Sequence, residues 1–283
     1  MYALNRLISF LNEAGPVARL RLTRVRGSSP REAGTEMFVS ATGLSGTIGG
    51  GQLEQRAIDA AREMLAKGDI ACHLDLPLGP EIGQCCGGRV EISVQRMRMA
   101  DKAAAISAAR RAHDSLPSVY VLGAGHVGRA LADLLQHLPV RTVLADQRQG
   151  ELALSGAMVE KRLCAIPEFE IQSAPPGSAF VVLTHDHALD FLLTAAALER
   201  GDARYVGMIG SATKRAKFRS WCARQCDGLS DAALTCPIGS GGSRDKRPEI
   251  IAAMVAAELM TALTPAAQHM QPDRAREIRL ATR

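Results

Sequence analysis

Aromatic residues and long apolar runs are both scarce in this chain. Aromatic side chains make up 4% of its 283 residues, and the formal net charge is only +5. Nucleic-acid interfaces usually combine basic residues with aromatic ones, so we expect no nucleic-acid binding. No apolar run approaches the roughly 20 residues of a membrane span, so we expect no membrane insertion. A hydrophobic content of 47% is ordinary for a globular protein.

The seven cysteines lack the spacing of a zinc site or a disulfide framework. Their number is odd, and no C-x-x-C pair occurs among them. The N-terminal segment, MYALNRLISFLNEAG, carries charges at Arg6 and Glu13 and has no A-x-A cleavage site. It therefore predicts a short amphipathic helix rather than a signal peptide, and we expect a cytoplasmic protein.

The hydrophobic pattern divides the chain into an α+β domain over residues 1–97 and a Rossmann-like domain over residues 98–283. In the first domain, apolar and basic residues alternate in Val17–Gly27, which predicts a strand, and Glu36–Gly43 predicts another. A glycine loop then leads into a helix that Gly68 ends. In the second domain, short apolar strands alternate with helices, as in a parallel sheet. The predicted fold class is α/β.

The stretch SVYVLGAGHVGRALADLLQHLPVRTVLAD contains the dinucleotide-binding fingerprint in its full context. Gly123, Gly125 and Gly128 form G-x-G-x-x-G between a strand and a helix, and the next strand ends at Asp146. The glycines permit a tight turn, the approach of a phosphate and close helix packing, and the acid suits a ribose hydroxyl. The pattern predicts a nucleotide site, for which NAD(P) is a candidate. The alternative is a Rossmann fold that has lost its nucleotide.

THDHALD, residues 184–190, follows a predicted strand, where the ligands of open α/β sheets bind. His185, Asp186 and His187 are candidates for metal ligands, a general base or contacts to a ligand. The two histidines alone make a poor metal site. The structural alternative is that Asp186 caps the following helix.

GMIGSATKR follows another predicted strand and allows two interpretations. In the first, Gly207 and Gly210 with Ser211 hold an anion, and Lys214 and Arg215 lie one turn inside the helix. In the second, Ser211 is a helix N-cap and both basic residues face solvent. CPIG, which begins at Cys236, is either a thiol site or a turn.

The first domain contains a glycine loop, GTIGGGQLE, whose successive amides resemble an anion-binding nest. Gly49, Gly50 and Gly51 precede a helix, and Glu54 lies in its first turn. A carboxylate there is stabilised by the helix dipole even when its role is purely structural.

A second glycine loop, IGQCCGG, contains Gln84, Cys85 and Cys86. As a metal site the two cysteines lack partners, and as a redox pair they form only a strained ring. A single thiolate that acts as a soft ligand or nucleophile fits best, since nearby amides lower a thiol's pKa. The alternative for one of the two is a buried structural cysteine, because successive residues entering a strand point in opposite directions.

In this order, the pieces resemble the xanthine dehydrogenase accessory protein family, which is also called XdhC/CoxI-like. The resemblance covers most of the chain and rests on eight stretches: GSSPREAGTEMFVS, GTIGGGQLE, LGPEIGQCCGGRVEI, VLGAGHVGRALA, VVLTHDHALD, YVGMIGSATKRAKF, CPIG and RPEIIAAMVAAEL. The family pattern GxxxGxKxPEE before the last helix here reads GSGGSRDKRPEI, one acid short.

The resemblance implies a molybdenum cofactor chaperone and not an enzyme. Such a chaperone binds the molybdopterin cofactor, brings it to a cysteine desulfurase and delivers it to apo xanthine dehydrogenase or a related molybdenum hydroxylase. We also expect a homo-oligomer. Carried onto this chain, the cofactor-binding positions lie in the two glycine loops and the Rossmann half. They are Gly49, Gly50, Gly51, Glu54, Gln84, Cys85, Cys86, Gly123, Gly125, Gly128 and Asp146, of which Cys85 and Cys86 are the candidates for contact with molybdenum.

Two further functions are compatible with the sequence. Gly123–Asp146, with His185 near a strand end, is typical of an NAD(P)-dependent oxidoreductase. A docking protein, in which the Rossmann half only recognises the target enzyme, is the weaker alternative.

Overall fold

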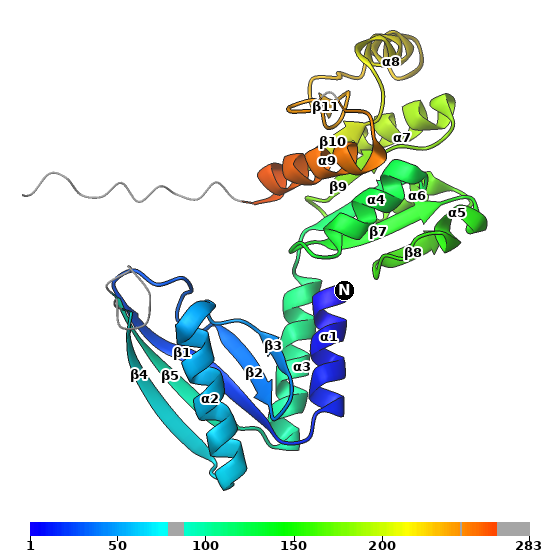
Figure 1. Ribbon diagram of the computed structural model, residues 1–283. Helices are drawn as coiled ribbons and strands as arrows, with labels where there is room; N and C mark the ends of the chain where they lie inside the picture. The colour runs from blue at the N-terminus through cyan, green and yellow to red at the C-terminus, as the bar shows by residue number, and fades with distance from the viewer. Residues whose placement is uncertain (79–87, 244, 265–283) are drawn as a thin grey trace, which may run out of the picture. The chain divides into compact units, whose positions relative to one another are not determined.

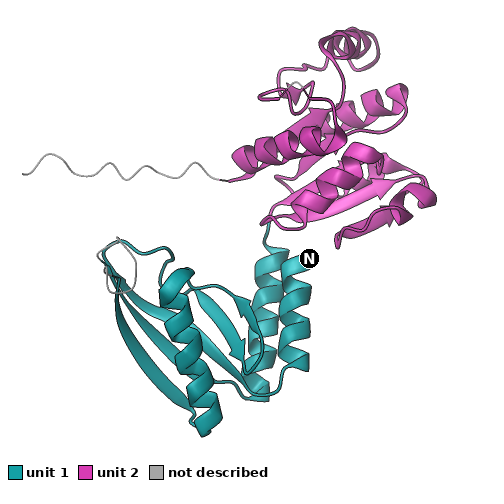
Figure 2. Cartoon of the chain, viewed as in Figure 1, with its two compact units in different colours: residues 1–116 teal, residues 117–283 magenta. Residues whose placement is uncertain are grey.

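The computed structural model describes residues 1–78, 88–243 and 245–264. The chain divides into two compact units, Met1–Leu116 and Pro117–Arg283 (Figure 2). No helix within the described ranges is long and apolar enough to cross a membrane.

The boundary between the units lies after Leu116 rather than at Met97, because helix α3 (Met99–Asp114) belongs to the first unit. This helix packs beside α1 (Tyr2–Glu13), with Ile106 of α3 in the same apolar cluster as α1 residues. The amphipathic N-terminal helix predicted from the sequence is therefore confirmed.

The first unit is a five-stranded antiparallel sheet in the order β3-β2-β1-β5-β4 (Figure 1). Its strands are β1 (Val17–Arg26), β2 (Glu36–Ser40), β3 (Leu44–Gly46), β4 (Ala71–Leu78) and β5 (Gly88–Arg96). Helix α2 (Gly51–Lys67) places Leu53 and Ala57 against Leu20 and Ile92 on one face of the sheet. It ends at Gly68, whose left-handed conformation (φ 81°) forms the predicted C-cap.

Strand β1 contains a bulge near its middle, which shifts the alternation of core-facing and outward-facing residues by one position. Leu20 and Leu22 point into the core, and the register with β5 then shifts between Leu22 and Arg24. A bulge adds one residue to one strand, so Val25 again packs against the core side.

The second unit is a six-stranded parallel sheet in the order β11-β10-β9-β6-β7-β8. Numbered within the unit, this is the doubly wound order of dinucleotide-binding folds. Its strands are β6 (Ser118–Leu122), β7 (Arg141–Asp146), β8 (Glu160–Leu163), β9 (Ala179–Val182), β10 (Tyr205–Met208) and β11 (Leu234–Thr235). Its helices are α4 (His126–Leu135), α5 (Gln149–Ala153), α6 (Pro167–Gln172), α7 (His187–Glu199), α8 (Ala212–Gln225) and α9 (Pro248–Leu263).

Helices cover both faces of this sheet, so every residue of the inner strand β6 is buried. On one face Val121 of β6 packs with residues of α4 and α9. On the other face Leu122 packs with Leu193 of α7 and Phe218 of α8. Asp146, a buried carboxylate at the end of β7, lies at the carboxyl edge of the sheet.

Candidate functional site

The three glycines of the fingerprint play different physical roles. A Cβ atom on Gly123 would lie 2.4 Å from the carbonyl oxygen of Leu183, and one on Gly128 would lie 2.0 Å from that of Gly123. Around Gly125 nothing lies within 4 Å of such an atom. The first and third glycines are therefore required for packing, and the second leaves open space at the N-terminus of α4, which fits the approach of a phosphate.

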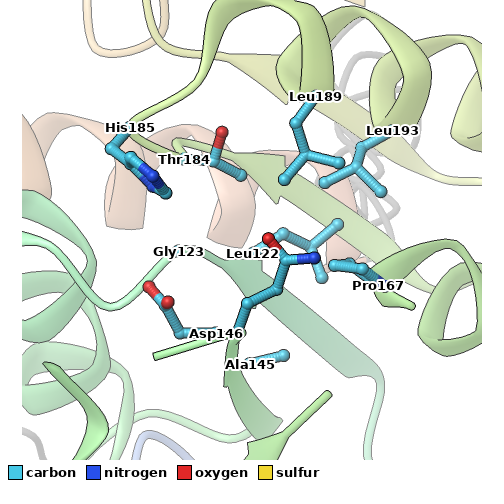
Figure 3. Close-up of a pocket in the computed structure, with 10 residues that line it drawn as sticks. Leu122, Gly123, Ala145, Asp146, Pro167, Thr184, His185, Leu189 and Leu193 are labelled. Carbon is cyan, nitrogen blue, oxygen red and sulfur yellow. The ribbon is translucent and has the colours of Figure 1, made fainter. Parts of the chain in front are cut away.

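A pocket lies at the carboxyl ends of β6, β7 and β9 (Figure 3). Asp146 and His185 lie on one side of it, and Pro167, Leu189 and Leu193 lie on the other (Figure 3). The other lining residues are Leu122, Gly123, Ala145, Gln147 and Thr184. One side of this pocket is therefore polar and the other apolar, and its cavity volume in this structure is about 10 Å³.

Asp146 is buried, and protein donors surround its carboxylate. Oδ2 accepts hydrogen bonds from the amide of Ala124 (2.7 Å) and from Nη2 of Arg148 (3.0 Å). Oδ1 accepts from the amide (2.8 Å) and Nε (3.0 Å) of Arg148. Burial raises the pKa of Asp146, but these hydrogen bonds outweigh it and lower the pKa overall. Asp146, which the sequence predicts to bind a ribose, thus also fixes the glycine loop through the amide of Ala124.

The same glycine loop is fixed from a second direction. Nη1 of Arg129 donates to the carbonyl oxygen of Ala124 and to Glu151. Both backbone polar groups of Ala124 are therefore bonded to charged side chains, Asp146 on the amide and Arg129 on the carbonyl. A loop held this way needs little reorganisation to bind a phosphate.

In the THDHALD segment, Thr184, His185 and Leu189 line the pocket and Asp186 caps a helix. His185 is exposed and lines the pocket. Oδ1 of Asp186 accepts from the amides of Ala188 (2.7 Å) and Leu189 (3.4 Å), so the capping role is confirmed for Asp186. His187 begins α7 and is exposed. No group of three metal-ligating side chains occurs among the described residues.

The expectation that Lys214 faces solvent is wrong. Its Nζ donates to Oδ2 of Asp190, and both side chains are buried. Ser211 does cap α8, because its Oγ accepts from the amide of Lys214 at 3.2 Å. Oδ1 of Asp190 also accepts from the amide and hydroxyl of Thr184, at 2.9 and 2.7 Å. This ion pair therefore holds the turn beside His185, and the sequence reasoning assigned Asp190 no such role.

In the first unit, the nest predicted at GTIGGG already contains a carboxylate. Oε2 of Glu54 accepts from the hydroxyl of Thr47 and from the amides of Ile48 (3.0 Å) and Gly50 (3.1 Å). Burial raises the pKa of Glu54, but the hydrogen bonds, that of Thr47 first among them, lower it overall. Glu54 therefore orders the loop, and the amides of Ile48 and Gly50 are not free for a phosphate.

Three of the sequence stretches converge in this unit. A Cβ atom on Gly49 would lie 2.6 Å from Cγ of Pro30. One on Gly88, where β5 begins, would lie 2.3 Å from the carbonyl oxygen of Ser28 and 2.7 Å from that of Arg26. The GSSP turn thus packs against both the GTIGGG loop and the residue that follows the cysteine loop.

Gln84, Cys85 and Cys86 lie outside the described residues. Arg31, which sequence reasoning passed over, is exposed and lies beside Gly49, with its Cγ 3.8 Å from a Cβ atom built there. The position of the Arg31 side chain beside a glycine loop becomes evident only from the fold.

Family comparisons agree with this division into two units. A family model described as the XdhC Rossmann domain matches residues 119–259, and one described as the XdhC and CoxI family matches residues 10–74. This chain belongs to the XdhC and CoxI family. The resemblance to the xanthine dehydrogenase accessory proteins is thereby confirmed, and the Rossmann interpretation of the second half with it.

The comparisons with individual proteins mainly concern the fold. The chain is 29% identical over 140 residues to YqeB of Escherichia coli, named an uncharacterized protein. That match covers 46% of this chain and only 22% of YqeB. A Bacillus halodurans protein described as a xanthine dehydrogenase superposes with a TM-score of 0.76 and 15% identity, over 96% of this chain and 99% of that one. At this identity the similarity shows a shared fold.

Proposed function

We propose that this XdhC/CoxI protein is a carrier that binds the molybdenum cofactor and delivers it to xanthine dehydrogenase or a related molybdenum hydroxylase. Family membership supports a link to xanthine dehydrogenase. The observation that carries the proposal is the packing of the GSSP turn against both the GTIGGG loop and Gly88. Segments that pack together in this way suit a binding site to which each of them contributes.

The residues of the first unit fit such a cofactor in their chemistry. Cys85 and Cys86 are soft donors, and the bound cofactor supplies a soft molybdenum centre that thiolates ligate well. Arg31, exposed beside Gly49, offers a guanidinium to a phosphate. Glu54 fixes the conformation of the GTIGGG loop by accepting hydrogen bonds from two of its amides. In this proposal the chain binds and orients cargo, and a cysteine desulfurase supplies the sulfur.

The two thiols are tested together with a third thiol from the same unit. The protein is purified anaerobically, and mass spectrometry identifies the small molecule released on denaturation. Transfer is measured as reconstitution of an apo molybdenum hydroxylase. Cys85→Ser combined with Cys86→Ser should abolish transfer, whereas Cys72→Ser in β4 should not. Unchanged binding and transfer in the double variant would refute the thiol role.

The second candidate function is an NAD(P)-dependent oxidoreductase, which the open space at Gly125 and the pocket beside His185 favour. Calorimetry with nicotinamide dinucleotides, followed by turnover of small carbonyl compounds, distinguishes the two functions. Binding with turnover that His185→Ala removes would support the oxidoreductase. Binding without turnover is the result expected for a carrier.

A further inference from the structure

The crevice of the second unit presents hydrogen-bond donors where a Rossmann nucleotide places its ribose hydroxyls. The acid at the end of the second strand, here Asp146 at the end of β7, normally accepts from those hydroxyls. A carboxylate has about four acceptor directions. In the described part of the chain Ala124 and Arg148 fill four of them. A ribose hydroxyl must therefore displace Arg148 before it can donate to Asp146.

The guanidinium of Arg148 still has N–H groups that can donate hydrogen bonds to a ligand. It uses Nε and Nη2 on Asp146, while Nη1 lies 4.0 Å from Oε1 of Glu151, beyond hydrogen-bond distance. Its side chain is 38% exposed, so the guanidinium reaches solvent beside the pocket. A guanidinium has five N–H groups and no acceptor, and it recognises the acceptor-only phosphate group better than a hydroxyl.

The surrounding charges allow Arg148 to turn toward a ligand. Asp146 keeps the amides of Ala124 and Arg148, and Glu151 keeps its ion pair with Arg129. Neither carboxylate is left without a donor when the guanidinium moves. A phosphate next to the two carboxylates would otherwise be repelled, which makes the charge of Arg148 decisive for binding.

We infer that this crevice selects a ligand that carries a phosphate monoester at the position of the ribose hydroxyls, with Arg148 as the specificity-determining residue. The apolar wall of Leu189 and Leu193 would contact the ring system of that ligand. Two sources share this chemistry, the 2′-phosphate of an adenosine nucleotide and the phosphate of molybdopterin. The inference goes beyond the proposed carrier function, because it concerns a site that contains none of the loop cysteines.

Calorimetry on the full chain with 2′,5′-ADP and 5′-ADP tests the adenosine source. We expect 2′,5′-ADP to bind at least tenfold more tightly than 5′-ADP. We also expect NADP⁺ to bind more tightly than NAD⁺. Arg148→Gln should remove the preference, and Arg148→Lys should keep only part of it, because lysine cannot bind a phosphate bidentately. Arg141→Gln removes one charge at the other end of β7 and should leave the preference intact.

A parallel arm with molybdopterin under anaerobic conditions distinguishes the two sources. If the adenosine probes show no preference but Arg148→Gln weakens molybdopterin binding at least tenfold, the phosphate belongs to the pterin. If Arg148→Gln leaves both kinds of probe unchanged, the inference is wrong. The double serine variant at Cys85 and Cys86 should keep the preference for the phosphate-bearing probe. A loss of cofactor transfer in that variant therefore tests the carrier proposal independently of the Arg148 site. Unchanged thermal unfolding of Arg148→Gln shows that the variant is folded.

Discussion

Nζ of Lys214 donates a hydrogen bond to Oδ2 of Asp190 in the interior of the second unit, where the two side chains are 9% and 1% exposed. The pair joins α8 to α7, and through Oδ1 of Asp190 it also holds Thr184 at the end of β9. The pair thus connects two helices to the segment after β9, which contributes Thr184 and His185 to the pocket.

Replacing Lys214 by methionine should destabilise the protein strongly, because Asp190 would remain charged and without its counterion. Removal of one partner of a buried pair typically costs about 3–5 kcal/mol. Urea denaturation of Lys214→Met measures the loss, and Lys217→Met, an exposed position on the same helix, should change stability by less than about 0.5 kcal/mol. Adding Asp190→Asn to Lys214→Met should recover part of the loss, and a loss equal to the sum of the single variants would contradict the pairing.

Asp231 should make stability depend on acid pH. Hydrogen bonds from Arg219 and Arg215 lower the pKa of Asp231 from 3.8 to about 2. A depressed pKa means that the stabilisation is complete above the unfolded value and is lost as the pH falls through the folded value. The shift corresponds to about 2 kcal/mol at most, and to roughly 1 kcal/mol once the solvent exposure of Arg219 is counted.

Denaturant unfolding from pH 7 downward checks this dependence. The difference between the wild type and Asp231→Asn should be largest at neutral pH and should shrink between about pH 4 and pH 2. Asp133→Asn, which changes an exposed carboxyl on α4, is the control. A difference that grows on acidification would have the wrong sign for this ion pair.

Local sequence pattern predicted most of the fold, since the elements depend on neighbouring residues. The strands predicted at Val17–Gly27 and Glu36–Gly43 are β1 (Val17–Arg26) and β2 (Glu36–Ser40), and Gly68 ends α2 as expected. The strand–glycine–helix order likewise placed Gly123 and Asp146 at adjacent strand ends. These features need only periodicity, glycine conformation and the rules of parallel sheets.

The pairings that complete the site could not be predicted, because they join side chains from separate elements. Nothing in the spacing of Asp190 and Lys214 distinguishes a buried pair from two exposed charges. The GTIGGG loop has the pattern of an anion-binding nest, and only the structure shows that Glu54 of the same segment fills it. In the same way Arg148 lies two positions after Asp146 in sequence, but its bidentate contact depends on the turn after β7.

Glu54→Gln should loosen the GTIGGG loop without unfolding the unit. The glutamine keeps an acceptor oxygen but loses the negative charge that three donors and the helix N-terminus stabilise. Hydrogen bonds to a charged acceptor contribute about 1.5–3 kcal/mol, so a loss of about 1–2 kcal/mol is expected. Hydrogen exchange of the Ile48 and Gly50 amides should quicken, while that of β4 should not. Equal rates in the variant and the wild type would show that the carboxylate does not order the loop.

Gly125 and Gly128 should respond to alanine in opposite ways. Gly125 has φ −67° and open space around it, so Gly125→Ala should change the free energy of unfolding by less than about 0.5 kcal/mol. The added methyl group occupies the space where a phosphate would approach, and calorimetry with 2′,5′-ADP should show at least tenfold weaker binding. Gly128→Ala places its methyl group 2.0 Å from the carbonyl of Gly123 and should cost more than about 3 kcal/mol. If Gly125→Ala binds as well as the wild type, no phosphate lies at the glycine loop.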